Sequence, residues 1–533
     1  MGKLRVGCVL DNPTQSAIAC DLIDKSRRAK SYSIDLLIVQ NSRVRNRNRF
    51  KASIEQAFLA LLKHAERFLV SGSTGQSCAL NKMNIETVHV NPDPLRNGSD
   101  KHMREKLEQI RSSTLDVLVC IGDENPLCEI LDLCRFGAIS LKFASNRAPG
   151  FWEVAARETS THFVIQQSTR HLPEGPVLFA AASPTAPFYT WNLARTCAKA
   201  NYHLHRLLED LGESQKIPEA VNKTPFCYPL DTEPAIGPLL SYVVRTCEYV
   251  GKKALRRIQG KGRRWGVAYQ FVDDWRSAIL GRSTIIKNPP NRFLADPFIV
   301  HKDGYHVCLV EDCDFATGKG KISAFKVTKD GCTELGTALE ETFHLSYPFI
   351  FEDSGDLYMC PETSRVNEIR LYKCIEFPLV WRLHRILKSN VSAADTSIFK
   401  LHGKWWMLTN IDSPGLGEHC SELHLFHSDS FDSTEWTPHR LNPIVVDPLR
   451  CRNGGLLISD GDVYRVFQVP GFDMYGQSMG IAKITKLTQE SYAEECLYSL
   501  PARFFSKLEG SHTFSFEKGL LAFDFVKVEH RRP

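Results

Sequence analysis

The chain has 533 residues, of which 43% are hydrophobic and 24% are charged. This balance is typical of a soluble globular protein, so the composition excludes a disordered, collagen-like or coiled-coil chain. The formal net charge of +5 is small for this length and gives no indication of a nucleic-acid partner. A usual domain size of about 150 residues predicts two to four domains.

Cysteine usage and the N-terminal sequence indicate the cellular compartment. The 17 cysteines are scattered, and no CxxC or zinc-site spacing occurs, so we expect neither a disulfide framework nor a metal site. The N-terminal sequence MGKLRVGCVLDN has no apolar signal region, and no apolar run approaches the ~18 residues of a membrane span. We therefore expect a cytoplasmic protein without a cofactor.

Residues 1–212 alternate short apolar segments with helical patterns. Near-continuous apolar runs are typical of buried parallel strands, and their alternation with helices predicts an α/β sheet. Amphipathic helices are expected at 54–70 and 190–211, where apolar residues recur at helical spacing. The expected strands lie at 4–10, 33–40, 115–122, 136–143, 161–168 and 175–182.

Residues 213–264 are expected to connect two domains. The segment begins polar and Pro-rich, and residues 238–264 then form an amphipathic, increasingly basic helical pattern. Such a helix can lie on an anionic lipid surface. The alternative is a connector that packs on a neighbour and ends in a solvated basic tail. We favour the connector, because nothing else in the sequence indicates a membrane.

Residues 265–533 lose the helical pattern and predict a five-bladed β-propeller. Five hairpins recur at intervals of about 50 residues, which is typical of propeller blades. Each hairpin is an apolar strand, a turn with glycine and a second apolar strand. The segment 265–271 is expected to close the ring with the last blade. The five turn glycines are Gly304, Gly355, Gly403, Gly461 and Gly519.

Polar residues stand where the first strand of each blade begins, near the expected propeller axis. Asp296 and Asp395 occupy the same place in blades one and three, and two or three carboxylates around one pocket suit glycosidic chemistry. A lone Asp-Pro more often marks a strand-start turn, but the repetition favours function. The candidate catalytic residues are Asp296, Asp395, Glu362 and Glu422. The candidate sugar-binding residues are Glu311, His344, Tyr347, Arg452, Asn453 and His512.

For six of these candidates, the sequence favours a structural role and a site-lining role equally. They are Glu311, Glu362, Glu422, His344, Arg452 and His512.

The propeller sequence resembles a known family. The runs RFLADPFIV (292–300), HLSYPFIFEDSGDLYMCPET (344–363) and NPIVVD (442–447) are similar to the N-terminal propeller of plant glucosamine inositolphosphorylceramide transferases. A more distant resemblance is to glycosidases of the arabinanase and invertase type. That resemblance implies that Asp296 is base or nucleophile and that Asp395 tunes the acid. The acid itself would fall near Arg452, where no carboxylate stands, so Glu362 or Glu422 would replace it.

The first half resembles the formyltransferase fold of the methionyl-tRNA and sugar-nucleotide formyltransferases, on residues 115–179. In that family an Asn and a His hold the formyl donor, and an Asp assists proton transfer. Ser140, Lys142 and Pro173 stand at those places here. The resemblance therefore implies a degenerate Rossmann-type domain rather than an active formyltransferase.

Together these patterns predict an α/β domain followed by an all-β propeller. The leading hypothesis is an enzyme that transfers or hydrolyses glycosidic bonds in glycan or glycolipid assembly, with a glycan, glycolipid or sugar-nucleotide ligand. The alternative is a non-catalytic glycan-binding scaffold that serves a separate glycosyltransferase. A residual formyl- or acyltransferase is a third hypothesis, which the loss of the Asn, His and Asp opposes. Peripheral contact with a membrane is left open.

Overall fold

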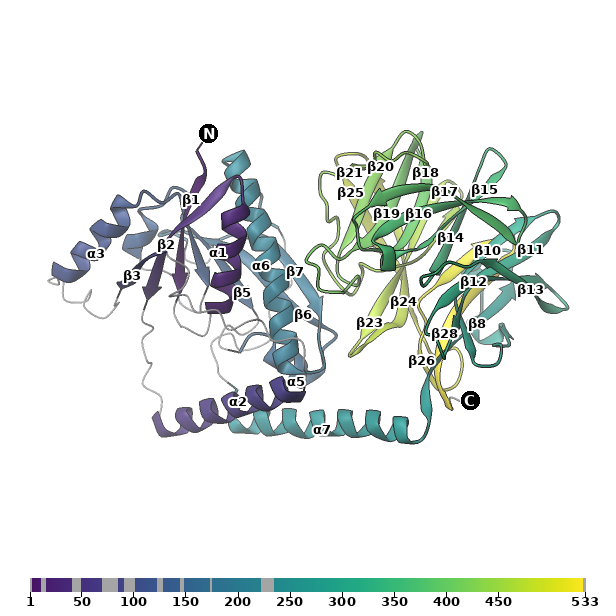
Figure 1. Cartoon of the computed structure of the whole chain (residues 1–533), viewed down its shortest axis with the longest axis horizontal. Coiled ribbons are helices and arrows are strands. Elements are labelled where there is room, and N and C mark those ends of the chain that lie inside the picture. The colour runs from purple at the N-terminus through teal and green to yellow at the C-terminus, as the bar shows by residue number, and fades with distance from the viewer. Residues whose placement is uncertain are drawn as a thin grey trace. The chain divides into compact units, whose positions relative to one another are not determined.

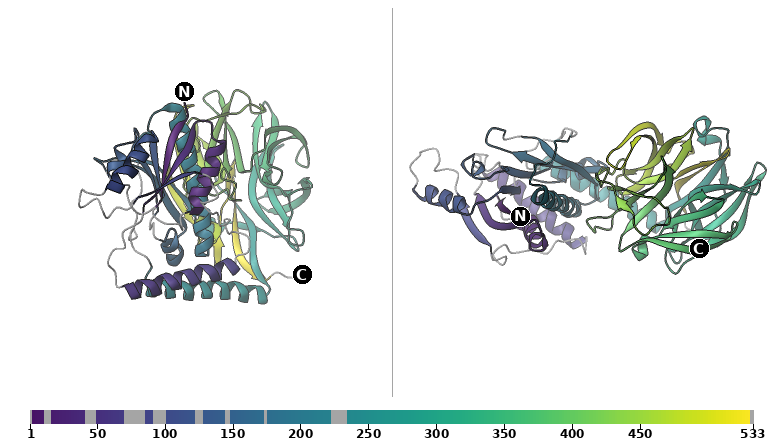
Figure 2. Two further views of the ribbon diagram at one scale, coloured as in Figure 1. Left: turned by 60° about the vertical axis from the view of Figure 1, so that its left-hand side comes forward. Right: turned by 90° about the horizontal axis from the view of Figure 1, so that it is seen from above.

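The chain divides into two compact units, Met1–Glu248 and Tyr249–Pro533. Their ribbons are drawn in Figure 1 and, from two further sides, in Figure 2. Pro173, one of the three positions compared with formyltransferases, lies outside the described residues. The computed structural model describes residues 2–10, 16–40, 49–69, 85–90, 101–121, 128–143, 148–172, 175–221 and 234–530.

The first unit is built on one seven-stranded sheet. Its strands are β1 (Leu4–Leu10), β2 (Tyr32–Gln40), β3 (Glu86–Val90), β4 (Val117–Ile121), β5 (Ala138–Phe143), β6 (Ser160–Ser168) and β7 (Val177–Pro184). They lie in the order β3-β2-β1-β4-β5-β6-β7. The pairs from β3 to β5 are parallel, and this order is that of doubly wound α/β sheets.

The last two strands differ from the expected parallel arrangement. β6 pairs with β5, and β7 pairs with β6, in antiparallel fashion. The segment between β6 and β7 is too short for the crossover that parallel neighbours need, so the chain turns back directly.

Helices accompany this sheet in chain order. They are α1 (Ser16–Arg28), α2 (Arg49–Leu69), α3 (Lys101–Ser112), α4 (Cys128–Leu131), α5 (Phe151–Ala156), α6 (Tyr189–Ser214) and α7 (Ile236–Ile258). α7 ends before the predicted limit at residue 264, because Gly260 turns the backbone to a positive φ of 62° and a strand begins at Lys261. Within the described part of the chain, no helix could cross a bilayer.

The second unit is a propeller of five sheets, which confirms the predicted fold. Blades one to four are four-stranded, and their strands are paired in sequence order. Blade one holds β10 (Arg292–Lys302), β11 (Tyr305–Asp314), β12 (Gly320–Thr328) and β13 (Gly331–Leu339). Blade two holds β14 (Ser346–Asp353), β15 (Asp356–Glu362), β16 (Glu368–Glu376) and β17 (Val380–Ser389). Blade three holds β18 (Ala393–Leu401), β19 (Lys404–Ile411), β20 (Leu423–Ser428) and β21 (Thr437–Pro438).

Blade five is completed by the first strand of the unit. Blade four holds β22 (Asn453–Ser459), β23 (Asp462–Gly471), β24 (Met474–Leu487) and β25 (Tyr492–Pro501). Blade five holds β26 (Leu508–Gly510), β27 (Phe514–Glu517), β28 (Leu520–His530), β8 (Lys261–Phe271) and β9 (Thr284–Ile286). β8 pairs with β28 from Lys261 to Phe271, so the predicted closure of the ring is confirmed and begins four residues earlier.

The five hairpins share one turn geometry, which explains their common sequence pattern. Each connects its strands by two residues that both have positive φ, such as His402 at 51° and Gly403 at 79°. Positive φ at both central positions defines the type I′ turn, which matches the twist of paired strands and favours glycine at the second position.

A second repeated feature lies at the inner strands. β10, β14 and β18 each carry a bulge where the strand passes the axis. At these bulges Asp296, Tyr347 and Asp395 have φ of 49°, 44° and 49°. Positive φ is unusual for residues other than glycine and concentrates at functional sites. Bulges also turn a side chain away from the regular alternation of a strand.

Candidate functional site

Asp296 lies buried at the bulge of blade one, within a set of hydrogen bonds from two other blades. Thr513 donates to its Oδ1 at 2.7 Å, and the backbone N–H of Tyr347 donates to its Oδ2 at 3.1 Å. Nδ1 of His512 lies 3.8 Å from Oδ1. These contacts hold the carboxylate in one orientation and favour its ionised form.

His512 stands between two carboxylates and an aromatic face. Its Nδ1 contacts Oδ2 of Asp524, and its ring stacks on Trp265 with centroids 4.0 Å apart. Burial lowers the pKa of His512, but Asp524 and then Asp296 more than reverse this, so its pKa is raised. The backbone N–H groups of His512 and Thr513 also bind Asp524, at 2.8 and 3.1 Å. The result is a fixed imidazole ring beside Asp296, and the two carboxylates favour its charged form.

Asp395, at the bulge of blade three, is held from blade four. Nε of Arg452 donates to its Oδ2 at 2.6 Å, and Gln468 donates to the same oxygen at 3.1 Å. The side chain of Asn453 donates to its backbone carbonyl at 2.9 Å. Arg452 also lies 3.8 Å from Glu362 of blade two. One guanidinium thus joins carboxylates from two blades.

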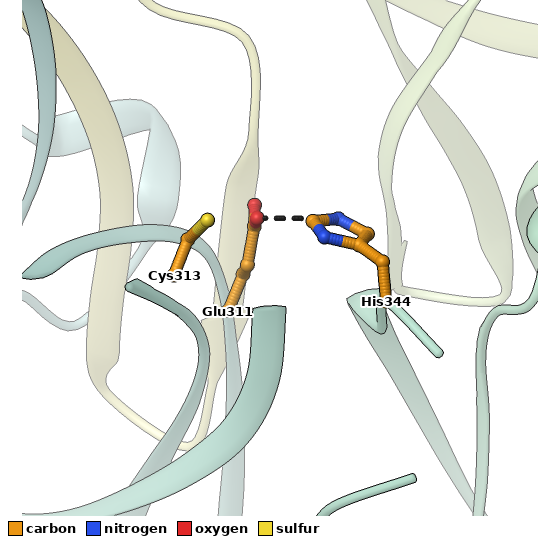
Figure 3. A group of neighbouring side chains, drawn as sticks. All are labelled: Glu311, Cys313 and His344. Atoms are coloured by element: carbon orange, nitrogen blue, oxygen red, sulfur yellow. Dashed lines mark ion pairs between the residues drawn. The ribbon is translucent and has the colours of Figure 1, made fainter. Parts of the chain in front are cut away.

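A third group of side chains comes from β11 and from the loop before β14. Figure 3 shows Glu311 between Cys313 and His344, with the imidazole facing the carboxylate. Nε2 of His344 lies 3.4 Å from Oε1 of Glu311. Gly320 allows this close approach, because a Cβ there would stand 2.5 Å from the backbone oxygen of Leu345 and 2.9 Å from the His344 ring.

These three residue types can ligate a metal, and their ligand atoms lie within 4.8 Å of one another. The backbone N–H of Gly320, however, donates to Nδ1 of His344 at 2.9 Å. A neutral imidazole that accepts at Nδ1 carries its proton on Nε2, the nitrogen that would have to bind the metal. This arrangement suits a hydrogen bond from His344 to Glu311 better than metal ligation. The group Asp296, His512 and Asp524 also lies within this ligand distance, but there Nδ1 already faces two carboxylates.

The carboxylates at the axis have unequal proton affinities. Burial, followed by repulsion from neighbouring carboxylates, raises the pKa of Glu311 well above its ordinary range. Burial raises the pKa of Asp395 to about 6, although Arg452 opposes the rise. Burial also raises the pKa of Asp296, against the charge of His512. The neighbours that act on Glu311 are Asp296, Glu362, Asp524 and Asp395.

Two of the candidate site residues, Tyr347 and Glu422, make contacts that differ from their predicted roles. The hydroxyl of Tyr347 lies 3.1 Å from Ser397, and its ring packs on Phe298, so its backbone rather than its hydroxyl serves Asp296. Glu422 is buried against His424, with 3.2 Å between Oε2 and Nε2. Asn410 holds the carbonyl of Glu422 at 3.0 Å. These contacts of Glu422 lie within blade three.

Several residues at the axis escaped the sequence analysis. Asp524 was hidden in the middle of an apolar strand, although a lone aspartate in such a run is itself a signal of a buried partner. Trp265 and Tyr475 flank His512, and the guanidinium of Arg452 lies 5.0 Å from the Tyr475 ring centroid. Tyr475 is 44% exposed. A small pocket beside them is lined by Arg263, Trp265, Asp473, Met474 and Tyr475.

The fold and the site define a five-bladed propeller with a group of buried carboxylates at its axis. Residues 277–507 match the family model described as glucosamine inositolphosphorylceramide transferase 1, N-terminal. The predicted resemblance is thereby confirmed over this part of the chain.

One curated relative and two solved structures are also similar to parts of this chain. Glucosamine inositolphosphorylceramide transferase 1 of Arabidopsis thaliana is 36% identical over 220 residues, which cover 40% of this chain and 28% of the relative. The α-L-arabinanase of Cellvibrio cellulosa is 14% identical with a TM-score of 0.31, over 38% of this chain and 77% of that one. A phosphoribosylglycinamide formyltransferase of Anaplasma phagocytophilum is 12% identical with a TM-score of 0.27, over 42% of this chain and 97% of that one. Similarity at these TM-scores carries no argument about activity.

Proposed function

We propose that the propeller is a carbohydrate-active domain that acts on glycosidic bonds in glycolipid assembly. The observation that carries the proposal is the meeting of Asp296, Asp395 and Glu311 at one axis with raised pKa values. Glycosidic chemistry needs one carboxyl group that keeps its proton near neutral pH and one that gives its proton up. The match to the N-terminal region of a glycolipid glycosyltransferase family supports the same class of substrate.

Within this proposal, Glu311 replaces Glu362 and Glu422 as the proton donor. Burial and four like charges act together to raise the pKa of Glu311, so it keeps its proton where other carboxyl groups lose theirs. His344 is its neighbour at 3.4 Å. Glu362 and Glu422 face basic side chains instead, since Arg452 lies 3.8 Å from Glu362 and His424 lies 3.2 Å from Glu422.

Asp296 is the base or nucleophile of the proposed reaction. Its hydrogen bonds from Thr513 and Tyr347 leave it oriented as an acceptor. As a base, it takes the proton of the attacking hydroxyl while Glu311 gives its proton to the departing glycosidic oxygen. Asp395, fixed by Arg452, orients the sugar and adds negative charge near Glu311. Tyr475 offers an exposed aromatic face to a sugar ring.

The test uses a strain of the source organism that lacks this gene. The strain is rescued with the wild type, Asp296→Asn, Glu311→Gln or the control Glu376→Gln, which neutralises an exposed carboxylate of blade two. Removing a general acid or base lowers a rate by about 10²- to 10⁴-fold. Mass spectrometry should therefore find the missing glycolipid restored by wild type and control only. Restoration by both site variants, at wild-type protein levels, would contradict the proposed chemistry.

A second candidate function is sugar binding without cleavage. The contact of Arg452 with both Asp395 and Glu362 favours it, because this cation stands near the place where the related glycosidases are expected to have their acid. The chain spans 28% of the length of the plant relative, so catalysis by a separate glycosyltransferase fits this alternative. Binding of a sugar by calorimetry, unchanged in Glu311→Gln and without turnover in the wild type, would establish it.

The first unit is proposed to be a formyltransferase-like domain without formyl-transfer activity. The resemblance over residues 115–179 supports this, and so does the doubly wound strand order. Ser140 and Lys142 lie on β5 at the places where the family has its Asn and His. Folate binding measured by fluorescence quenching should be undetectable, and tight binding would contradict the proposal.

A further inference from the structure

α7 presents one apolar face that its neighbours leave exposed. Leu239 and Tyr242 are buried, and Tyr242 donates a hydrogen bond to Glu66 of α2. Ile236, Leu240 and Val244 recur every four residues, so they share another face of the helix. All three are exposed, and Val244 is 66% accessible. The helix thus uses one side for packing and leaves an apolar stripe on another.

α2 carries a second stripe of the same kind. Ile54, Leu61 and Phe68 recur every seven residues and are exposed, with Phe68 at 82%. Leu59 and Glu66, on another side of the helix, are buried. α2 and α7 run side by side along the lower edge of the first unit in Figure 1 and in the left view of Figure 2. We call these six exposed residues the helix-pair patch.

The two helices are also strongly basic. They hold nine Lys or Arg residues and three Asp or Glu residues. Two of the cations near the end of α7 pair with carboxylates, Lys253 with Asp473 and Arg256 with Glu509. The remaining cations still outnumber the acidic residues of the two helices. Exposed aliphatic and aromatic side chains on basic helices are the features by which interfacial helices bind anionic lipid.

We propose that the helix-pair patch binds the surface of an anionic lipid bilayer. The aliphatic side chains and Phe68 enter the boundary between headgroups and acyl chains, while the basic residues meet the lipid charges. The positive charge disfavours a second copy of this chain as occupant, because two copies would bring like charges together. The inference goes beyond the proposed function and does not depend on it, since the patch lies outside the propeller.

The test is co-sedimentation of the full chain with vesicles of phosphatidylcholine, with or without phosphatidylserine. The wild type should sediment with the phosphatidylserine vesicles and much less with phosphatidylcholine alone, and added salt should weaken binding. The triple variant Leu61→Ser, Leu240→Ser and Val244→Ser should bind the anionic vesicles at least about tenfold more weakly, because it removes apolar area without touching charge.

The control removes equally exposed aliphatic side chains elsewhere. Ile375→Ser with Ile458→Ser lies on the propeller and should bind vesicles as the wild type does. All five substitutions are at exposed positions, so thermal melting should match the wild type. The proposal fails if the wild type ignores anionic vesicles or if the triple variant binds them normally. It also fails if light scattering shows a wild-type dimer that the triple variant dissociates, since the patch would then be a self-interface.

Discussion

The two units of this chain differ in the number and placement of their buried charged side chains. In the first unit a largely apolar cluster packs around the sheet, and the buried charged residues among those described are spread over α2, α5 and α6. They are Glu55, Glu66, Glu153 and Lys199. In the propeller, buried charges are more numerous, and several of them meet at the axis. They are Asp296, Glu311, Asp312, Asp395, Glu422, Arg465 and Asp524.

This difference is the reason why we place the proposed site in the propeller. A propeller brings strand ends from distant parts of the sequence to one axis, so a few polar residues in each blade suffice. In the first unit, Ser140, one of the three positions compared with formyltransferases, is fully buried within the sheet. The carboxylates at the propeller axis are also buried, so the two units differ in how many charged groups meet at one place rather than in burial.

The largest expected effect comes from one buried ion pair of the propeller. Arg465 is fully buried and donates to Glu494 from two nitrogens, at 2.8 and 2.6 Å. Arg465→Met leaves a buried carboxylate without its cation, which costs about 3 to 5 kcal/mol. Urea unfolding followed by circular dichroism should show this loss.

An exposed pair of the first unit is the matched comparison. Nε of Arg5 lies 2.8 Å from Asp35, a separation like that in the propeller pair, but both side chains are partly exposed. Arg5→Met should cost less than about 1 kcal/mol. Equal losses in the two variants would mean that burial does not set the strength of these pairs, and the contrast between the units would fail.

The next effect concerns a buried carboxylate of the first unit. Burial, with some repulsion from Glu158, raises the pKa of Glu153 to about 7, and its Oε2 has no hydrogen-bond partner among the described residues. A pKa that is higher in the folded state means that stability is lost as the pH rises from about 4.5 through about 7. Glu153→Gln removes this loss, by up to about 3 kcal/mol at pH 8.

Denaturant midpoints measured between pH 4 and pH 8 test this expectation. The variant and the wild type should agree near pH 4, where Glu153 is protonated in both states, and separate as the pH rises. The control Glu158→Gln removes the neighbouring charge and should give only part of the gain. A pH-independent difference would show that the pKa of Glu153 is the same in the folded and unfolded states, which would contradict the expectation.

The sequence predicted the propeller well, because its signals are local. The turn glycines and the strand alternation depend only on neighbours in the chain, and the closure by 265–271 follows from an unpaired strand at one end. The places of Asp296 and Asp395 followed from the same repeat. By contrast, the antiparallel β6 and β7 depend on a connection length that strand patterns do not reveal.

Contacts between blades could not be predicted from the sequence. Glu311 meets His344 because a loop of one blade lies over a strand of the next, and this loop helps to bury the carboxyl group. Arg452 was predicted to bind a ligand, and the structure adds that its Nε donates to Asp395. A single sequence contains no record of which blade ends approach each other, so pairings of this kind need coordinates.

The smallest expected effect returns to the hairpin turns of the propeller. His402 is exposed and has a φ of 51° at the first central position of a type I′ turn. Asn tolerates this conformation better than His, since its short side chain binds the local backbone. His402→Asn should stabilise the protein by about 0.5 kcal/mol, whereas Gly403→Ala, at a φ of 79°, should cost about 1 kcal/mol. Differential scanning calorimetry should show a higher melting temperature of the propeller for His402→Asn and a lower one for Gly403→Ala. A higher melting temperature for Gly403→Ala would mean that this turn does not adopt the type I′ geometry in solution, and it would contradict the shared geometry of the five hairpins.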